Sequence, residues 1–349
     1  MMLLHEKLLD EAVAHSAAWA GRLVGKAVLV TGASGFLASS LLVFLSRLDR
    51  AYRLGLDLHA TARRAPEEVD LFRFLRMKIP GRWVRASIEE TEVPEIPDIV
   101  VVHTASFGSP KDYQREPIAT FRANTEGVLG LYEKASRCRA SQFIYLSSAE
   151  VYGQPPDAQI PTAEDFVGAL PTLSPRSIYG ESKRMAEVLG ACMAQATGIP
   201  FTAARPWNIY GPGQRVQDGR VPIEFMRQAR ESGQISLLSN GSPCRSFCHA
   251  WVGVRQIAGL LGSLSQAAAW NVGFGQGEIS MLELARSCAR ACGLAESVVT
   301  YDPAAQTLGM QRSAPDTTRI DRELGPAPTV TLDEGLGTLR EWLDFLEKR

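Results

Sequence analysis

The sequence predicts an α/β protein with a doubly wound parallel sheet and a smaller C-terminal lobe that binds a substrate. Between residues 25 and 150, apolar strand-like runs alternate with helix-like segments, a pattern typical of a parallel sheet covered by helices on both faces. A glycine-rich turn directly follows the first of these runs. The segments from about residue 208 to 248 and from about 278 onward are richer in turns and short helices, which indicates a second lobe.

Seven apolar runs are expected to form the strands of this sheet, and two longer segments are typical of the helices between them. The expected strands are Lys26–Val30, Leu54–Ala62, Trp83–Ala86, Ile99–His103, Phe143–Ser147, Phe201–Ala204 and Trp270–Val272. The clearest helical segments are Ala38–Arg47 and Ile118–Arg137.

The chain of 349 residues is longer than a usual single domain, so we expect more than one unit. Residues 1–22 are expected to form a helical extension, because Leu4, Leu8 and Leu9 have the spacing of a short amphipathic helix. Residues 23–207, joined by about 250–275, are assigned to the sheet-containing domain. The remaining residues, 208–249 and 276–349, are assigned to the substrate-binding lobe.

Composition excludes several classes of protein. The 37 Lys and Arg residues balance 38 Asp and Glu residues, which argues against nucleic acid or an anionic membrane surface as a partner. No apolar stretch is long enough to cross a bilayer. The six cysteines do not form a disulfide framework, and no histidine pair accompanies them, so we expect a cytoplasmic protein without a metal site.

The glycine-rich turn predicts a dinucleotide-binding site. Gly32 permits a tight turn, Gly35 lets backbone N–H groups approach a pyrophosphate, and Ala38 allows close packing of helix on strand. The strand–turn–helix context favours this reading over a purely structural turn. The residues expected to contact the cofactor here are Gly32, Ser34, Gly35, Phe36 and Leu37.

The end of the second strand bears on the choice of nicotinamide cofactor. An acidic residue there would bind the ribose 2′-OH of NAD, whereas a basic residue would accommodate the 2′-phosphate of NADP. Arg63 and Arg64 follow the strand, and Asp57 lies too early in it, so the sequence favours NADP over NAD. The alternative is that both arginines are solvated surface charges.

A Tyr-x-x-x-Lys motif indicates a redox centre. Tyr179 and Lys183 lie four residues apart and share a helix face, so an ammonium can lie beneath the phenol and favour the phenolate. The phenol could then accept a proton from an alcohol. Ser147 and Ser148, at the end of a predicted strand, could orient it through a hydroxyl group.

These motifs occur in an order that resembles one family. Besides the glycine loop and Tyr179/Lys183, the chain contains His103-Thr104-Ala105-Ser106, Pro117, Asn124-Thr125-Glu126-Gly127, Ser147–Gly153, Arg205–Pro212, Asp218–Pro222, Gly241–Phe247 and Asn271-Val272-Gly273. Over residues 25–345 the sequence resembles the extended short-chain dehydrogenase/reductase family, which contains nucleotide-sugar epimerases, dehydratases and decarboxylases.

The resemblance implies a Rossmann domain that binds NAD(P) and a lobe that binds a nucleotide-diphosphate sugar. It assigns Thr104, Ala105, Ser106 and Asn124 to the cofactor site, and Ser148, Tyr179 and Lys183 to catalysis. It also implies a homodimer, commonly formed through a helical bundle that includes the Tyr-x-x-x-Lys helix. The run 184–196 is apolar enough on one face for such a contact, although burial within the monomer would explain the same pattern.

Family chemistry implies hydride removal from sugar C4 to give a 4-keto intermediate, and Glu150 bears on the fate of that intermediate. A glutamate before Val-Tyr-Gly is similar to 4,6-dehydratases and glucuronate decarboxylases, whereas simple 4-epimerases have no acid there. Ala149 replaces the acidic proton donor of many dehydratases. A 4-epimerase or 4-ketoreductase remains the alternative, and so does a non-catalytic NAD(P)-binding regulator.

Four residues are candidates for binding the substrate. By resemblance, Arg245 faces the phosphates or a sugar carboxylate, and Asn208 binds the pyrophosphate, while Arg215 and Arg220 are further candidates that could equally face solvent. The family's usual Gly-Asp after the third strand is replaced by Ala86-Ser87, so we expect a different adenine contact. His103 and His249 are expected to be packed structural histidines.

Overall fold

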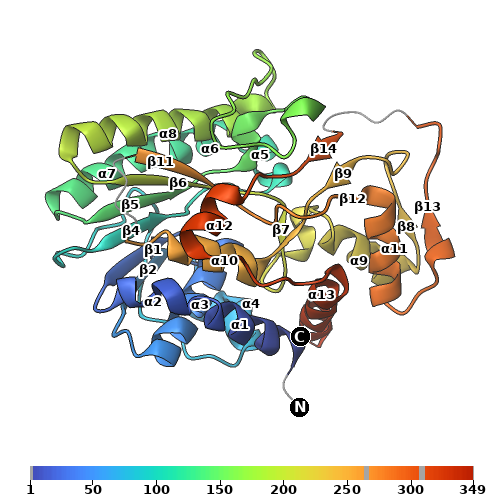
Figure 1. The fold of residues 1–349 in the computed structure, drawn as a ribbon, viewed down its shortest axis with the longest axis horizontal. Helices are drawn as coiled ribbons and strands as arrows, with labels where there is room; N and C mark the ends of the chain where they lie inside the picture. Colours follow the sequence, from blue (N-terminus) through green and yellow to red (C-terminus); the bar gives the residue numbers. More distant parts are fainter. Residues whose placement is uncertain (1–2, 263–266, 306–310, 349) are drawn as a thin grey trace.

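A seven-stranded, all-parallel sheet forms the centre of the protein (Figure 1). The computed structural model describes residues 3–262, 267–305 and 311–348. The strand order is β11-β6-β5-β4-β1-β2-β3, so the chain moves outward from β1 first in one direction and then in the other. The strands are β1 (Ala27–Thr31), β2 (Asp57–Ala62), β3 (Arg82–Arg85), β4 (Val100–His103), β5 (Gln142–Leu146), β6 (Phe201–Pro206) and β11 (Ala267–Val272).

Helices cover both faces of the sheet, and each face has its own apolar core. Val28 and Val30 of β1 pack in the core that contains α3, whereas Leu29 packs in the core that contains α7 and α8. This alternation explains why β1 is apolar from Ala27 to Val30, since both of its faces are buried. The helices around the sheet are α3 (Phe36–Tyr52), α4 (Asp70–Phe74), α5 (Pro110–Arg115), α6 (Pro117–Asn124), α7 (Glu126–Arg137), α8 (Ser177–Thr197), α10 (Ala250–Gly259) and α12 (Thr318–Leu324).

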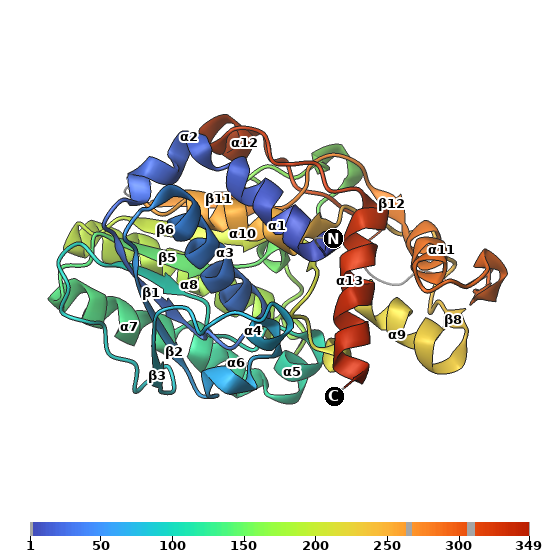
Figure 2. The same ribbon diagram turned by 90° about the horizontal axis from the view of Figure 1, so that it is seen from below.

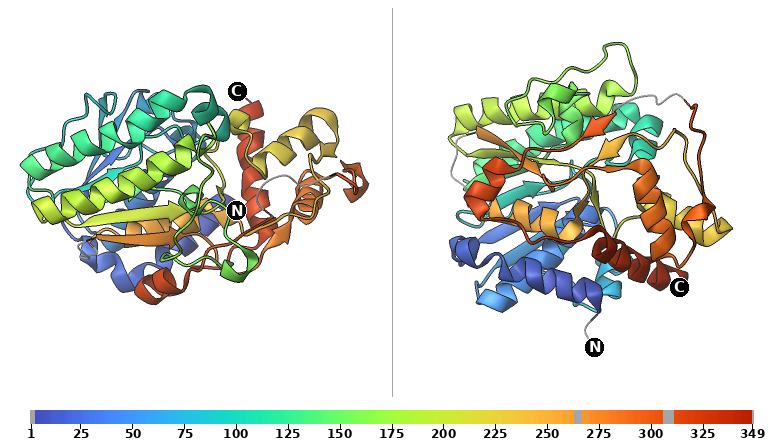
Figure 3. Two further views of the ribbon diagram at one scale, coloured as in Figure 1. Left: turned by 90° about the horizontal axis from the view of Figure 1, so that it is seen from above. Right: turned by 45° about the vertical axis from the view of Figure 1, so that its right-hand side comes forward.

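A smaller lobe lies beside the carboxyl ends of the strands (Figure 3). Its core is formed where α9 (Ile223–Ser232), α11 (Met281–Ala291) and α13 (Leu332–Glu347) pack together. Short strands complete the lobe and its connections: β7 (Ile209–Tyr210), β8 (Ile235–Ser236), β9 (Cys244–Arg245), β10 (Cys248–His249), β12 (Ile279–Ser280), β13 (Val299–Thr300) and β14 (Arg312–Ser313).

The structure confirms the predicted fold class and corrects several element boundaries. The second strand begins at Asp57 rather than Leu54. The helix expected over 118–137 is two helices, because the chain leaves helical geometry at Thr125, whose hydroxyl donates to the carbonyl of Phe121.

An N-terminal helix, α1 (Leu4–Ala14), lies beside α13 on the outside of the sheet domain (Figure 2). The Glu341 carboxylate of α13 accepts bonds from the backbone N–H groups of Leu4 and His5 and from the His5 imidazole at 2.7 Å. At the other end of α1, the buried Arg255 donates to the carbonyl of His15. Both ends of α1 are therefore fixed by charged side chains of other helices.

No helix in the described part of the chain combines the length and the apolar character needed to cross a bilayer.

Replacing Glu341 with alanine should lower the free energy of unfolding by about 2 kcal/mol, because two helix N–H groups and a buried imidazole lose their acceptor. Chemical denaturation followed by circular dichroism measures the change. Glu11→Ala is the matched control, since its exposed pair with Lys7 spans 3.6 Å, and we expect it to stay within about 0.5 kcal/mol of the unmodified protein. Equal stabilities for the two variants would contradict the role assigned to Glu341.

Candidate active site

One large cavity opens at the carboxyl ends of the sheet strands and extends to the small lobe. Its volume of about 1680 Å³ exceeds the roughly 300–1,000 Å³ of a pocket for one small ligand, so it can hold two. Its walls come from the loop after β1, the ends of β2, β4 and β5, the start of α8, and α13 of the small lobe. Ligands of parallel α/β sheets generally bind at this edge.

The glycine loop forms one end of the cavity. Gly32 has a φ of 64°, and a Cβ there would lie 2.7 Å from the Cα of Ala105, so both its conformation and its packing require glycine. Gly35 precedes α3 and provides no side-chain cap for its first N–H groups. These N–H groups can therefore donate hydrogen bonds to a bound anion. Arg64 reaches over this loop and donates to the carbonyl of Ser34.

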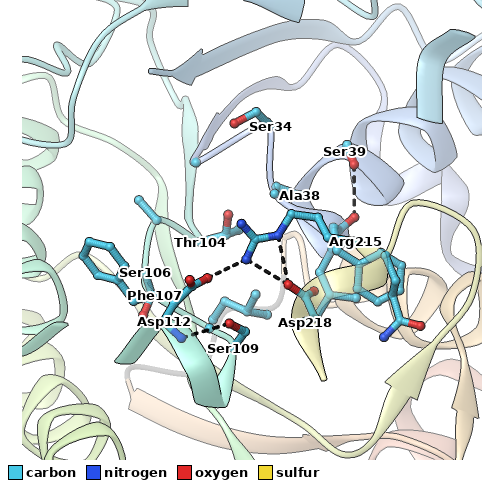
Figure 4. A pocket seen from close by; sticks show the side chains of 18 of the residues that line it. Ser34, Ala38, Ser39, Thr104, Ser106, Phe107, Ser109, Asp112, Arg215 and Asp218 are labelled. Atoms are coloured by element: carbon cyan, nitrogen blue, oxygen red, sulfur yellow. Dashed lines mark hydrogen bonds and ion pairs between the residues drawn. The ribbon is translucent and has the colours of Figure 1, made fainter. Parts of the chain in front are cut away.

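Ser106 follows β4 in the cavity wall opposite the glycine loop (Figure 4). Its hydroxyl oxygen is buried, and no described residue hydrogen-bonds to it. Since buried polar atoms almost always have a partner, this hydroxyl fits a polar group of a bound ligand. The neighbouring Thr104 instead donates to the carbonyl of Thr31 at 2.6 Å and holds the β4 loop against the glycine loop.

Tyr179 and Lys183 share one face of α8 and point toward the end of β5. The Lys183 ammonium donates to the carbonyl of Leu146 at 2.7 Å and lies 5.7 Å from the centre of the Tyr179 ring. The Ser148 hydroxyl forms a hydrogen bond with the Tyr179 phenol. The phenol, the hydroxyl and the ammonium predicted from the sequence are thus brought together and line the cavity.

The charges around this phenol differ from those expected. Burial raises the pKa of Tyr179 above its ordinary value, while the charge of Arg220 and the bond to Ser148 lower it. Among the cations near the phenol, Arg220 therefore has the largest effect against burial. Burial also lowers the pKa of Lys183 to about 7, against an opposing effect of Glu187.

Tyr113 and Arg176 are two further residues at this centre, and the sequence reasoning missed both. The Tyr113 ring stacks on Tyr179 with 4.7 Å between centroids and an angle of 12°, and its phenol hydrogen-bonds to Arg176. Glu150, which follows Ser148 on a 3₁₀ turn (Ala149–Tyr152), lies close enough to raise the pKa of both phenols. For Tyr113, the only hint in the sequence was its place one turn after Ser109-Pro110, which is a helix-start signal.

The four residues predicted to bind substrate all line the cavity. Arg215 forms ion pairs with Asp112 and Asp218 (Figure 4), so its charge is compensated within the protein. Arg220 donates to the carbonyl of Gly108. Arg245 donates to the carbonyl of Cys244 at 2.8 Å, and the Asn208 amide donates to the carbonyl of Ser246 at 3.0 Å.

Asn124, which was also predicted to contact the cofactor, lies behind the cavity. It is fully buried between α6 and α8, and its amide donates to the Ser182 hydroxyl at 2.9 Å. Asn124 does not belong to the described residues that line the cavity. Its position is set by packing of the two helices, so it supports α8 from behind.

The two histidines expected to be structural are both buried. His103 contacts the Thr31 hydroxyl at 2.8 Å, and His249 contacts the Thr338 hydroxyl at 3.0 Å. Burial lowers the pKa of each to about 3. Asp57 lies at the amino end of β2, 3.1 Å from His59, so it is far from the edge where a cofactor ribose would lie.

Known proteins of similar sequence act on nucleotide sugars. UDP-glucuronic acid decarboxylase 6 of Arabidopsis thaliana is 30% identical over 318 residues, which cover 90% of this chain and 88% of that protein. UDP-glucuronic acid decarboxylase 1 of Xenopus tropicalis is 29% identical over 319 residues, which cover 89% of this chain and 70% of that protein.

Solved structures share the fold at lower identity. UDP-glucuronic acid 4-epimerase of Bacillus cereus, in complex with UDP-glucuronic acid and NAD, superposes with a TM-score of 0.75 at 22% identity, over 92% of this chain and 99% of that one. dTDP-glucose 4,6-dehydratase of Bacillus anthracis gives a TM-score of 0.74 at 19% identity, with coverages of 93% and 98%. Residues 28–273 match the NAD dependent epimerase/dehydratase family, and the chain belongs to this family.

Proposed function

We propose that the protein is an NAD(P)-dependent enzyme that oxidises C4 of a nucleotide-diphosphate sugar and then removes the C6 carboxyl group, with UDP-glucuronate as the substrate. The observation that carries the proposal is the grouping of Ser148, Glu150, Tyr179 and Lys183 in one cavity with the glycine loop. The sequence relatives that are UDP-glucuronic acid decarboxylases favour decarboxylation over dehydration. Ala149, which cannot donate a proton to a leaving hydroxyl group, agrees with this choice.

The cofactor site is assigned to residues that suit a dinucleotide. The N–H groups at the start of α3 would bind the pyrophosphate, and the unpartnered Ser106 hydroxyl would bind a polar group of the cofactor. When bound, the cofactor supplies the nicotinamide that takes a hydride from C4 and later returns it. The residues proposed to line its site are Gly32, Ser34, Gly35, Phe36, Leu37, Arg63, Arg64, Thr104, Ala105, Ser106, Tyr179 and Lys183.

The Tyr179 phenol is proposed to accept the proton of the C4 hydroxyl group as the hydride leaves C4. The Ser148 hydroxyl orients that oxygen, and the cation of Arg220 together with Lys183 stabilises the phenolate. Once C4 is a ketone, the bond between C5 and the carboxyl carbon can break, because its electrons move into the carbonyl group as an enolate. Carbon dioxide leaves, C5 would take a proton from solvent, and Tyr179 would return its proton to the C4 oxygen when C4 is reduced back to the alcohol.

Glu150, Arg245 and Arg176 are proposed to favour decarboxylation of the 4-keto intermediate over its other possible reactions. Arg245 and Arg176 line the cavity near Glu150 and can hold a carboxylate through paired N–H groups. Asn208, Arg215 and Arg220 are proposed to contact the diphosphate. Arg215 would then exchange one of its present carboxylate partners, Asp112 or Asp218, for phosphate oxygen atoms.

Purified protein with NAD should convert UDP-glucuronate to a product that is lighter by one carbon dioxide, as measured by mass spectrometry. Tyr179→Phe should lower kcat by about a hundredfold or more, because proton transfer to a positioned base is lost. Glu150→Gln should lower the rate of decarboxylation by a larger factor than it lowers the affinity for NAD. Unchanged substrate mass with inverted C4 configuration would identify a 4-epimerase instead, and loss of one water would identify a dehydratase.

Arg63 and Arg64 are proposed to tilt the cofactor preference toward NADP, since both follow β2 at the cavity and Arg64 lies over the glycine loop. Replacing both with alanine should weaken NADP binding by about tenfold and leave NAD binding within about twofold, because only NADP carries the 2′-phosphate. Fluorescence titration with both cofactors measures this. Equal loss for the two cofactors would contradict the assignment.

We further propose a homodimer formed through α6, α7 and α8. Apolar side chains of these three helices are exposed along one side of the protein: Ile118, Phe121, Leu129, Met185 and Val188. Met185 and Val188 fall within the apolar run that the sequence indicated, and burial inside the monomer does not account for them. An exposed apolar surface of this kind is typical of a subunit contact.

Val188→Glu should convert such a dimer to a monomer, because it places a charge in the centre of the apolar contact. Light scattering after size-exclusion chromatography measures the mass. Leu238→Glu is the control, since Leu238 is fully exposed in the small lobe, where it follows β8 and lies outside these helices. A monomeric unmodified protein would refute the dimer.

A further inference from the structure

Three side chains on one face of α8 hold three consecutive residues at the end of β5. They lie four residues apart, which is the spacing that aligns side chains along a helix. The pairs are Tyr179 with the Ser148 hydroxyl, Lys183 with the Leu146 carbonyl at 2.7 Å, and Glu187 with the Ser147 hydroxyl at 2.5 Å. The first two pairs belong to the proposed catalytic centre, whereas the mechanism so far gives no role to the third.

Glu187 is a charged residue in a nearly closed environment. Its side chain is 15% exposed, and both of its oxygen atoms accept bonds from Arg205 on β6, at 2.9 and 2.5 Å. The same Oε1 atom also accepts the bond from Ser147. Because Arg205 binds both oxygen atoms, the carboxylate cannot rotate, and the Ser147 hydroxyl has one fixed acceptor.

The fixed carboxylate is itself held by a wider network. Arg205 donates to the Tyr152 phenol oxygen at 2.7 Å, and that phenol donates to Asn271 on β11 at 2.8 Å. Trp207 donates to the same Asn271 oxygen at 2.9 Å. Glu187 thus connects the end of β5 to the two strands beyond it, β6 and β11.

Glu187 also provides the negative charge one turn beyond Lys183. Burial destabilises the Lys183 ammonium, and the Glu187 carboxylate is the group that opposes this effect. The other titratable and charged groups near Lys183 and Glu187 come from the elements packed around them. They are His103 on β4, Tyr145 on β5, Tyr179 on α8, Arg205 on β6, Tyr152 on the 3₁₀ turn and Glu164 in the loop after it.

We propose that Glu187 is a positioning residue of the catalytic centre. Through Ser147 it fixes the strand end that carries Ser148, and through its charge it keeps Lys183 in the ammonium form beside Tyr179. The inference rests on the proposed function for its catalytic meaning, whereas the effect on Lys183 can be measured without any reaction.

Ser147→Ala tests the positional part. It removes one hydroxyl group and leaves the ion pair between Glu187 and Arg205 intact, so the protein should fold normally. With NAD and UDP-glucuronate we expect kcat to fall by about tenfold while KM changes by less than about twofold, because Ser148 loses its fixed orientation and not its substrate contacts. The pH dependence of kcat should stay in place.

Glu187→Gln tests the charge. With the carboxylate gone, Arg205 is left as a buried cation, and the pKa of Lys183 should fall by about one pH unit. Nuclear magnetic resonance of protein with ¹³C-labelled lysine follows this titration, and the signal is assigned by its loss in Lys183→Met. The unmodified protein should titrate near pH 7, and the variant clearly below. Glu187→Asp retains the charge and should restore the midpoint.

Glu181→Gln is the matched control, because Glu181 is an exposed acid on the same helix, paired with Arg184. It should leave the Lys183 midpoint unchanged. If Glu187→Gln destabilises the fold, the kcat of Ser147→Ala still decides the positional part of the proposal. An unshifted midpoint in folded Glu187→Gln, or wild-type kcat in Ser147→Ala, overturns the inference. A shifted midpoint in a protein that transforms no nucleotide sugar would instead refute the proposed function alone.

Discussion

The contact between α8 and the carboxyl end of β5 is the interaction on which the rest of the site depends. The Lys183 ammonium, which is almost completely buried, has a backbone carbonyl as its direct acceptor. Together with the bond from Ser147 to Glu187, this bond holds the helix that carries Tyr179 against the strand end that carries Ser148. A buried ammonium is costly unless it is bonded and has an opposite charge nearby, and Glu187 supplies that charge. The geometry of the proposed catalytic centre therefore depends directly on the packing of this helix.

This dependence changes how the Tyr-x-x-x-Lys motif is understood here. The sequence alone indicated an ammonium that lowers the pKa of the phenol. The structure places both groups where burial disfavours the charged form of each, with Arg220 opposing burial at the phenol and Glu187 opposing it at the ammonium. The proposed proton-transfer centre thus includes charges from α8 and from the loop before α9, rather than two residues on one helix.

Much of the architecture could be predicted, because the signals are local. Strands buried on both faces appear as continuous apolar runs, and the glycine loop must contain Gly32, since no Cβ fits beside Ala105. Prediction was wrong where two local signals compete. Hydrophobic spacing predicted one helix over 118–137, whereas Thr125 divides it into two. The resemblance predicted a cofactor contact for Asn124 and gave no sign that its amide donates to the Ser182 hydroxyl between two helices. Tyr113 could not be found, because it meets Tyr179 only through the tertiary fold, and Arg176, which directly precedes α8, meets Tyr113 only there.

In the proposed reaction, the Tyr179 phenol meets a sugar hydroxyl beside the nicotinamide ring. A crystal structure of the Tyr179→Phe variant with NAD and UDP-glucuronate tests this most directly. We expect the sugar O4 within hydrogen-bond distance of the Ser148 hydroxyl, C4 facing the nicotinamide, and the carboxylate close to Glu150 and Arg245. A nucleotide sugar bound with C4 turned toward solvent, or a ring at position 179 directed away from the nicotinamide, would contradict the proposed reaction.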